Sequence, residues 1–264
     1  MTASSRMKNN PLRVNGMLKN LYQKSQLVFA LAWIIAYVVL ASTGDNVSAD
    51  LGIDKIATLP ILIVMSMILY LFVRKNDLTE IYGLCSPKLP AAKMLYYIPL
   101  LVLLTANLWY GVAMNMTPLE TVLYVLTMFC VGFLEELIFR GLLFRAMARN
   151  GVKSAIIVSS VTFGIGHIVN QINGSGAGLL PNLLQVLYAV AIGFAFVMIY
   201  CRTKSLMPCI IVHSVFNGLS AFANEAVMTT QREILSGILL AVIAGGYALY
   251  LALAVKEEIK EETT

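Results

Sequence analysis

The segment VGFLEELIFRGLLFRAM, which runs from Val131 to Met147, places two adjacent carboxylates, Glu135 and Glu136, and the guanidinium of Arg140 in an otherwise largely apolar run. Successive residues of an α-helix are about 100° apart, so Glu136 and Arg140 lie on one face and are expected to form an ion pair. Glu135 points away from Arg140 and has no partner on its own helix. It is therefore free to face a polar cavity and to act as a general base.

The only two histidines of the chain also lie in apolar runs, His167 in SSVTFGIGHIVN and His213 in MPCIIVHSVFNGLS. Asn217 follows His213 by four residues, which places the imidazole and the carboxamide on one helical face. Taken singly, each histidine is explained more simply as a hydrogen-bonding contact between helices. In the same way, the two glutamates and Arg140 are explained as an ion network that holds helices together. Taken together, a carboxylate, two imidazoles and a carboxamide are typical of a hydrolytic site.

The composition indicates the medium that surrounds these residues. Of the 264 residues, 59% are hydrophobic and 12% are charged, whereas soluble domains average about 45 to 50% apolar and about 25% charged residues. Apolar runs of about 20 residues are typical of transmembrane helices. We therefore expect an all-α, polytopic integral membrane bundle with about eight transmembrane helices, at residues 27–43, 56–73, 95–113, 119–144, 153–170, 179–201, 205–223 and 234–255.

The predicted spans divide the chain into three parts. Residues 1–26 are expected to form a basic cytoplasmic segment, residues 27–255 an integral membrane domain, and residues 256–264 a cytoplasmic tail. The core of the membrane domain, residues 119–223, holds all the candidate site residues. The four cysteines have neither a CxxC pair nor the spacing of a zinc site or a disulfide framework, so they indicate no further function.

The distribution of Lys and Arg predicts the orientation. Of the 19 basic residues, 17 fall at one end of the predicted spans, and only Lys55 and Arg232 fall at the other. The positive-inside rule then places both the N- and C-termini in the cytoplasm. Basic residues that face anionic membrane lipids account for the net charge of +5, so no nucleic-acid partner is expected. We expect a multi-pass protein of a bacterial plasma membrane.

The polar residues are predicted to lie at similar depths in the membrane, so their side chains can come together. Glu135 lies 14 residues from Arg149, and His167 lies 14 residues from Lys153, so each is about 21 Å from a basic helix end at the rise of an α-helix. His213 lies about 14 Å from the next basic position by the same measure. We therefore expect one site in the cytoplasmic half of the membrane or near its midplane.

Three short motifs resemble those of the CPBP family of intramembrane proteases. EELIFRG (Glu135–Gly141) is similar to EExxxR, FGIGH (Phe163–His167) to FxxxH, and HSVFN (His213–Asn217) to HxxxN. The family includes the type II CAAX prenyl endopeptidases, the Rce1-like enzymes and the bacterial Abi proteins. Each motif alone is weak, but the ordered set on three separate predicted helices is specific. The resemblance covers Thr121 to Ala223.

The resemblance implies an endopeptidase that hydrolyses a peptide bond without a covalent intermediate. Its substrate would be a membrane-associated or prenylated protein or peptide. By analogy with the family, Glu135 and His167 activate a water molecule, and His213 with Asn217 donate hydrogen bonds to the tetrahedral oxyanion. An imidazole and an amide on one helical face suit a developing negative charge.

Glu136 and Arg140 then have a structural or substrate-orienting role, and no cofactor is required. Zinc is the alternative, with His167, His213 and Glu135 as ligands, because catalytic zinc commonly takes three protein ligands and a water molecule. The chain lacks the HExxH arrangement, in which one helix carries two zinc ligands and the base. Asn217 also suits an oxyanion hole better than a zinc shell. Metal-free hydrolysis is therefore the favoured interpretation.

Two other classes of protein remain as alternatives. The first is a non-catalytic bacteriocin-immunity or membrane interaction protein on the same fold, for which Glu135 would be dispensable. The second is a transporter or channel with a Glu/His proton relay. It would show inverted repeats and interrupted helices, and no clear pair of Gly/Pro-interrupted segments occurs in matching halves of the chain.

Overall fold

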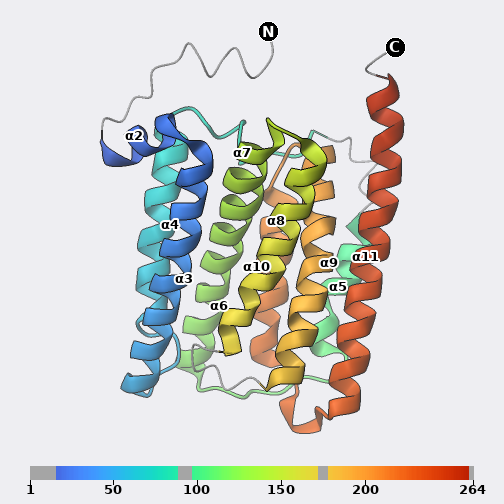
Figure 1. Cartoon of the computed structure of the whole chain (residues 1–264). Coiled ribbons are helices and arrows are strands. Elements are labelled where there is room, and N and C mark those ends of the chain that lie inside the picture. The colour runs from blue at the N-terminus through green and yellow to red at the C-terminus, as the bar shows by residue number, and fades with distance from the viewer. Residues whose placement is uncertain (1–15, 89–96, 172–177, 262–264) are drawn as a thin grey trace.

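A computed structural model describes residues 16–88, 97–171 and 178–261, and most of them are helical (Figure 1). Within these ranges the only extended pairing is one isolated antiparallel bridge between Val112 and Ala223. The all-α prediction is thus confirmed. The helices are α2 (Met17–Lys24), α3 (Gln26–Leu51), α4 (Thr58–Lys75), α5 (Ile98–Leu104), η2 (Ala106–Leu108), α6 (Pro118–Glu135), η3 (Glu136–Phe144), α7 (Arg145–Ala148), α8 (Val152–Gly166), η4 (His167–Gln171), α9 (Leu179–Thr203), α10 (Met207–Leu219), η5 (Ser220–Phe222), η6 (Glu225–Val227) and α11 (Thr230–Glu261).

Six of the described helices are long and apolar enough to cross a membrane, which makes the chain a multi-pass membrane protein. The predicted spans at 95–113 and 205–223 correspond to shorter apolar helices, Ile98–Leu108 and Met207–Phe222. These two segments are apolar along their length but fall below the length of about 20 residues that a full crossing needs. Eight full crossings therefore stay a prediction. The six long helices are Gln26–Leu51, Thr58–Lys75, Pro118–Ala148, Val152–Val169, Leu179–Thr203 and Thr230–Leu253.

The helix ends that carry basic residues gather at one end of the bundle. Figure 1 shows α2 and α7 at the top of the view, together with the C-terminal ends of α4, α9 and α11. Arg74 and Lys75 lie in the last turn of α4, and Arg202 lies in the last turn of α9. The side of the membrane that this end faces stays a prediction. Residues 1–15, with the remaining basic residues of the N-terminal segment, lie outside the described ranges.

The central helix of the bundle is the continuous run of α6, η3 and α7, residues Pro118–Ala148. It begins with a capping box in which Thr117 and Glu120 each bind the backbone N–H of the other, and Pro118 occupies the first turn. The run packs against α3 and α4 on one side and against α8 and α10 on others. Glu135 and Glu136 lie near its middle, so the neighbouring helices surround them.

Two glycines let the helices of the site approach closely. A Cβ atom on Gly132 of α6 would lie 2.3 Å from the Oγ of Ser214 on α10, and one on Gly164 of α8 would lie 2.3 Å from a methyl carbon of Val190 on α9. Both distances are far below van der Waals contact, so only glycine fits at these crossings. Small residues of this kind allow membrane helices to pack backbone against backbone. They bring α10 to α6 and α9 to α8, and thereby set the positions of the two histidines.

Candidate functional site

The EExxxR-like motif lies in a π-helix. Residues Glu136–Phe144 form this wider turn within the central helix, and all nine of them are buried. Such π-helical segments are rare and frequently lie at functional sites. The sequence analysis assumed α-helical spacing, which this segment departs from. The expected ion pair is nevertheless present, with Nη1 of Arg140 3.0 Å from Oε1 of Glu136 and both side chains fully buried.

Arg140 is further held by aromatic rings. Its guanidinium carbon lies 3.9 Å from the ring centroid of Phe163 and 5.6 Å from that of Phe196. A cation over an aromatic face is stabilised by the ring quadrupole, most strongly where water is excluded. Removal of the guanidinium would leave Glu136 as an uncompensated buried charge. Arg140 therefore connects the central helix to α8 and α9.

His213 lies between the two glutamates. Its Nδ1 is 2.8 Å from Oε1 of Glu136, and its Nε2 is 3.6 Å from Oε2 of Glu135. An ionised carboxylate only accepts hydrogen bonds, so Nδ1 carries the proton that it donates to Glu136. Nε2 is thereby directed toward Glu135. Glu135, Glu136, Arg140 and His213 form one contiguous set of side chains, hereafter the charged cluster.

Glu135 has a partner that the sequence analysis did not anticipate. The hydroxyl of Tyr37, on α3, donates a hydrogen bond of 2.6 Å to Oε1 of Glu135. Glu135 has no partner on its own helix, as expected, and Tyr37 comes from α3, which packs directly against the central helix. Oε2 of Glu135 is buried, and no hydrogen-bond partner in the described structure reaches it.

His167 is oriented by its own helix and by α9. Its Nδ1 lies 3.2 Å from the carbonyl oxygen of Phe163. A carbonyl only accepts, so Nδ1 is the donor, and in the neutral imidazole Nε2 keeps the free lone pair. The buried amide of Asn182 donates a hydrogen bond of 3.0 Å to the carbonyl oxygen of His167 and holds the start of η4 in place.

The two histidines pack edge-on around one aromatic ring. The ring centroid of Phe163 lies 5.3 Å from that of His167 and 5.7 Å from that of His213. Edge-to-face arrangements at these separations are favourable for aromatic pairs. The FxxxH-like motif therefore contributes both a histidine and the ring that separates it from the second histidine.

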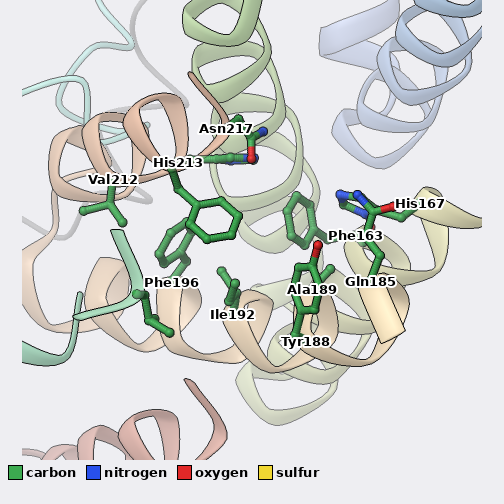
Figure 2. A pocket seen from close by; sticks show the side chains of 12 residues that line it. Phe163, His167, Gln185, Tyr188, Ala189, Ile192, Phe196, Val212, His213 and Asn217 are labelled. Carbon is green, nitrogen blue, oxygen red and sulfur yellow. The ribbon is translucent and has the colours of Figure 1, made fainter. Parts of the chain in front are cut away.

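His167, His213 and Asn217 line one cavity, which measures about 460 Å³ when counted to its open mouth (Figure 2). Gln185 and Tyr188 of α9 are the other polar residues of its lining. Glu135 is not among the lining residues, but its Oε2 lies 3.6 Å from Nε2 of His213, which is. The structure thus brings three of the four predicted catalytic residues to one cavity and places the fourth beside His213. The rest of the lining is apolar: Leu103, Phe163, Ala189, Ile192, Phe196, Val212 and Phe216.

The proposed zinc ligands are not gathered into a metal site. Among the residues that the structure describes, no group of three or more His, Cys, Asp or Glu side chains is arranged to hold a metal ion. Of the three alternative ligands, His213 and Glu135 are neighbours, whereas Nδ1 of His167 is occupied by a backbone carbonyl. The described geometry does not fit a preformed three-ligand shell. The need for a metal stays a prediction to be tested in solution.

Three contacts around the site come from residues that sequence reasoning missed. Tyr37 binds Glu135, Asn182 binds the backbone of His167, and Asn107 of η2 donates a hydrogen bond of 2.6 Å to the carbonyl oxygen of Phe216. Each is a hydrogen-bonding side chain within or beside an apolar run, and this is the only signal that could have pointed to it. Their partners lie between 15 and 109 residues away in the sequence.

Comparison with known proteins gives one family. No curated protein matches the chain at the significance required. Residues 116–219 match the family described as type II CAAX prenyl endopeptidase Rce1-like. The match runs from the start of the central helix to the end of α10 and includes both glutamates, Arg140, both histidines and Asn217, but not Tyr37. The part of the chain that builds the charged cluster and most of the cavity therefore matches the Rce1-like type II CAAX prenyl endopeptidases, a family of proteases.

Proposed function

We propose that this protein is an intramembrane endopeptidase that hydrolyses a peptide bond in a membrane-associated or prenylated protein or peptide. The observation that carries the proposal is the position of His213 between Glu135 and Glu136, at the wall of a cavity that it shares with His167 and Asn217. Two imidazoles and an amide donor around one cavity, with a carboxylate base beside one of the imidazoles, suit attack by water on a carbonyl carbon.

In the proposed reaction, Glu135 is the general base. A water molecule between Oε2 of Glu135 and Nε2 of His167 loses a proton to the carboxylate, and its oxygen forms a bond to the carbonyl carbon. Oε2 suits this task because it is buried and no protein hydrogen bond reaches it. When the tetrahedral intermediate collapses, the same proton passes to the leaving amine nitrogen and the C–N bond breaks. Water thus supplies the hydroxyl of the new acid and a proton of the new amine.

His213 and Asn217 are proposed to stabilise the oxyanion. For His213 to donate from Nε2 while Nδ1–H binds Glu136, the imidazole must carry both protons. The two carboxylates Glu135 and Glu136 then balance the two cations Arg140 and His213. The Asn217 amide, one helical turn further along α10, supplies a second donor. Preorganised donors in a site that excludes water stabilise developing charge far better than they would in bulk water.

Glu136 and Arg140 are proposed to orient rather than to react. Glu136 binds both His213 and Arg140 through the same oxygen, Oε1. Glu136 therefore sets the direction of the His213 ring, as a carboxylate does for the histidine of a hydrolase. If Glu136→Gln abolished cleavage while Glu135→Gln kept it, this division of roles would be reversed.

The apolar lining of the cavity suits an apolar side chain or a lipid chain beside the scissile bond. The family description names prenylated CAAX proteins as the substrates of its members, and this class is the one that we propose here. The two glutamates lie near the middle of the central helix, Pro118–Ala148. We propose that a substrate reaches the site from the cytosol or the inner leaflet of a bacterial plasma membrane.

The test is proteolysis by purified protein in liposomes, with a quenched peptide library that includes farnesylated CAAX peptides. Wild type, Glu135→Ala and His167→Ala are compared with and without a chelator. Cleavage that both substitutions remove and the chelator spares supports metal-free hydrolysis. Cleavage that a chelator abolishes and zinc restores would make the protein a metalloprotease. A folded protein that cleaves no peptide would favour an immunity or interaction role, and proton-coupled flux would favour transport.

A further inference from the structure

We infer that Tyr37 positions the carboxylate of Glu135 for catalysis, a role that rests on the proposed function. Tyr37 lies on α3, outside the residues 116–219 that match the family. Its hydroxyl donates a hydrogen bond of 2.6 Å to Oε1 of Glu135, and only 9% of the residue is exposed. The protease-like segment is therefore completed by a side chain from the N-terminal part of the same chain.

The two oxygens of Glu135 face different neighbours. Oε1 accepts from Tyr37, whereas Oε2 lies 3.6 Å from Nε2 of His213 and has no hydrogen-bond partner in the described structure. Rotation of the carboxyl group would exchange the two oxygens. The phenol resists that rotation and keeps Oε2 directed toward the side from which water must approach. Supporting hydrogen bonds of this kind typically decide whether a reactive group is held closely enough for its task.

The hydroxyl of Tyr37 can be separated from the packing of its ring. Phe29, Trp33 and Tyr37 are spaced four residues apart on the buried face of α3. Phenylalanine in place of Tyr37 would keep this apolar face intact. The hydroxyl is costly to bury without a partner, and its partner is the carboxylate of Glu135. Tyr37→Phe therefore removes one hydrogen bond at the site and leaves the packing of α3 against the central helix in place.

The first test is the kinetics of Tyr37→Phe. We expect kcat to fall on the order of 10- to 100-fold, the range typical for loss of a group that orients a reactive side chain, with KM and the melting temperature nearly unchanged. The matched control is Tyr82→Phe, because Tyr82 is also buried and its hydroxyl donates a hydrogen bond of 2.7 Å to Tyr22, outside the site. Unchanged kcat in Tyr37→Phe, or a fall that the control reproduces, would overturn the role.

A second measurement does not depend on turnover. The infrared difference spectrum between wild type and Glu135→Gln isolates the carboxylate stretch of Glu135, and the same difference is then recorded in Tyr37→Phe and Tyr82→Phe backgrounds. We expect the band to shift in the Tyr37→Phe background alone. A band that stays in place refutes the contact itself. If the band shifts but the protein cleaves no substrate, the contact between Tyr37 and Glu135 is confirmed and the proposed function fails. The catalytic role of Tyr37 then fails with it.

Discussion

The charged cluster and the cavity are neighbours but are built on different physical principles. In the charged cluster, Glu136 and Arg140 are fully buried, and His213 is fixed by a carboxylate on each side. In the cavity, His167 contacts a backbone carbonyl of its own helix and the ring of Phe163, and most of the lining is apolar. Charge is thus held beside the cavity by an ion pair and hydrogen bonds, whereas the lining of the cavity itself is mostly apolar.

The largest effect on activity should come from Glu135, whose Oε2 lies 3.6 Å from the cavity residue His213. We expect Glu135→Gln to lower kcat/KM by about 100- to 10,000-fold, the usual contribution of a general base, because an amide cannot take a proton from water. The isosteric amide still accepts the hydrogen bond of Tyr37, so the fold should be kept. Initial rates in liposomes, with a thermal melt alongside, measure both. If this variant cleaves at the wild-type rate, Glu135 is not the general base, and the proposed division of roles between the charged cluster and the cavity is wrong.

The next effect should be on stability and should be specific to the charged cluster. We expect Arg140→Met to destabilise the protein by about 3 to 5 kcal/mol, because Glu136 would remain as a buried charge without its ion pair. Thermal or denaturant unfolding in detergent measures the change.

The control for this prediction is the double variant Arg140→Met with Glu136→Gln, which removes both charges. It should recover most of the lost stability, since the penalty arises from the unpaired partner. If the double variant is as unstable as the single one, the contacts of Arg140 with Phe163 and Phe196, rather than its ion pair, stabilise the site.

In the cavity, a substitution should affect rate without affecting stability. We expect Asn217→Ala to lower kcat by about 100- to 1,000-fold, the loss typical of one oxyanion-hole donor. The side chain lines the cavity and is only partly buried, so the melting temperature should change little. Parallel measurement of kcat, KM and the melt separates the two effects. A large drop in stability with unchanged kcat would show that Asn217 stabilises the fold rather than the oxyanion. The charged cluster and the cavity would then not differ in the way proposed.

The smallest effect should come from an ion pair at the opposite end of the bundle. Lys55 and Asp45 form a partly exposed pair at 2.8 Å. Partly exposed pairs contribute about 0.2 to 1 kcal/mol, so Lys55→Gln should change stability by no more than that amount and should leave cleavage unchanged. The same assays serve as the measurement. A clear loss of cleavage in this variant would show that activity depends on the bundle as a whole rather than on the charged cluster and the cavity.

Contacts within one helix were accessible from the sequence. The Glu136–Arg140 pair follows from a spacing of four residues, and His213 with Asn217 shares one face for the same reason. Apolar runs likewise indicated the positions of the helices. Their lengths were less well defined, since composition does not distinguish a full span from the shorter helices Ile98–Leu108 and Met207–Phe222.

The sequence alone predicted a helical membrane protein, the ion pair of the central helix and the residue types of a hydrolytic site. The contacts of Glu135 with Tyr37, 98 residues away, and of Glu136 with His213, 77 residues away, are visible only in the folded chain. The same holds for the π-helix that begins at Glu136 and for the position of Glu135 beside the cavity rather than in its lining. The physical reason is that backbone geometry fixes the neighbours within a turn, whereas neighbours on other helices depend on close packing at positions such as Gly132 and Gly164.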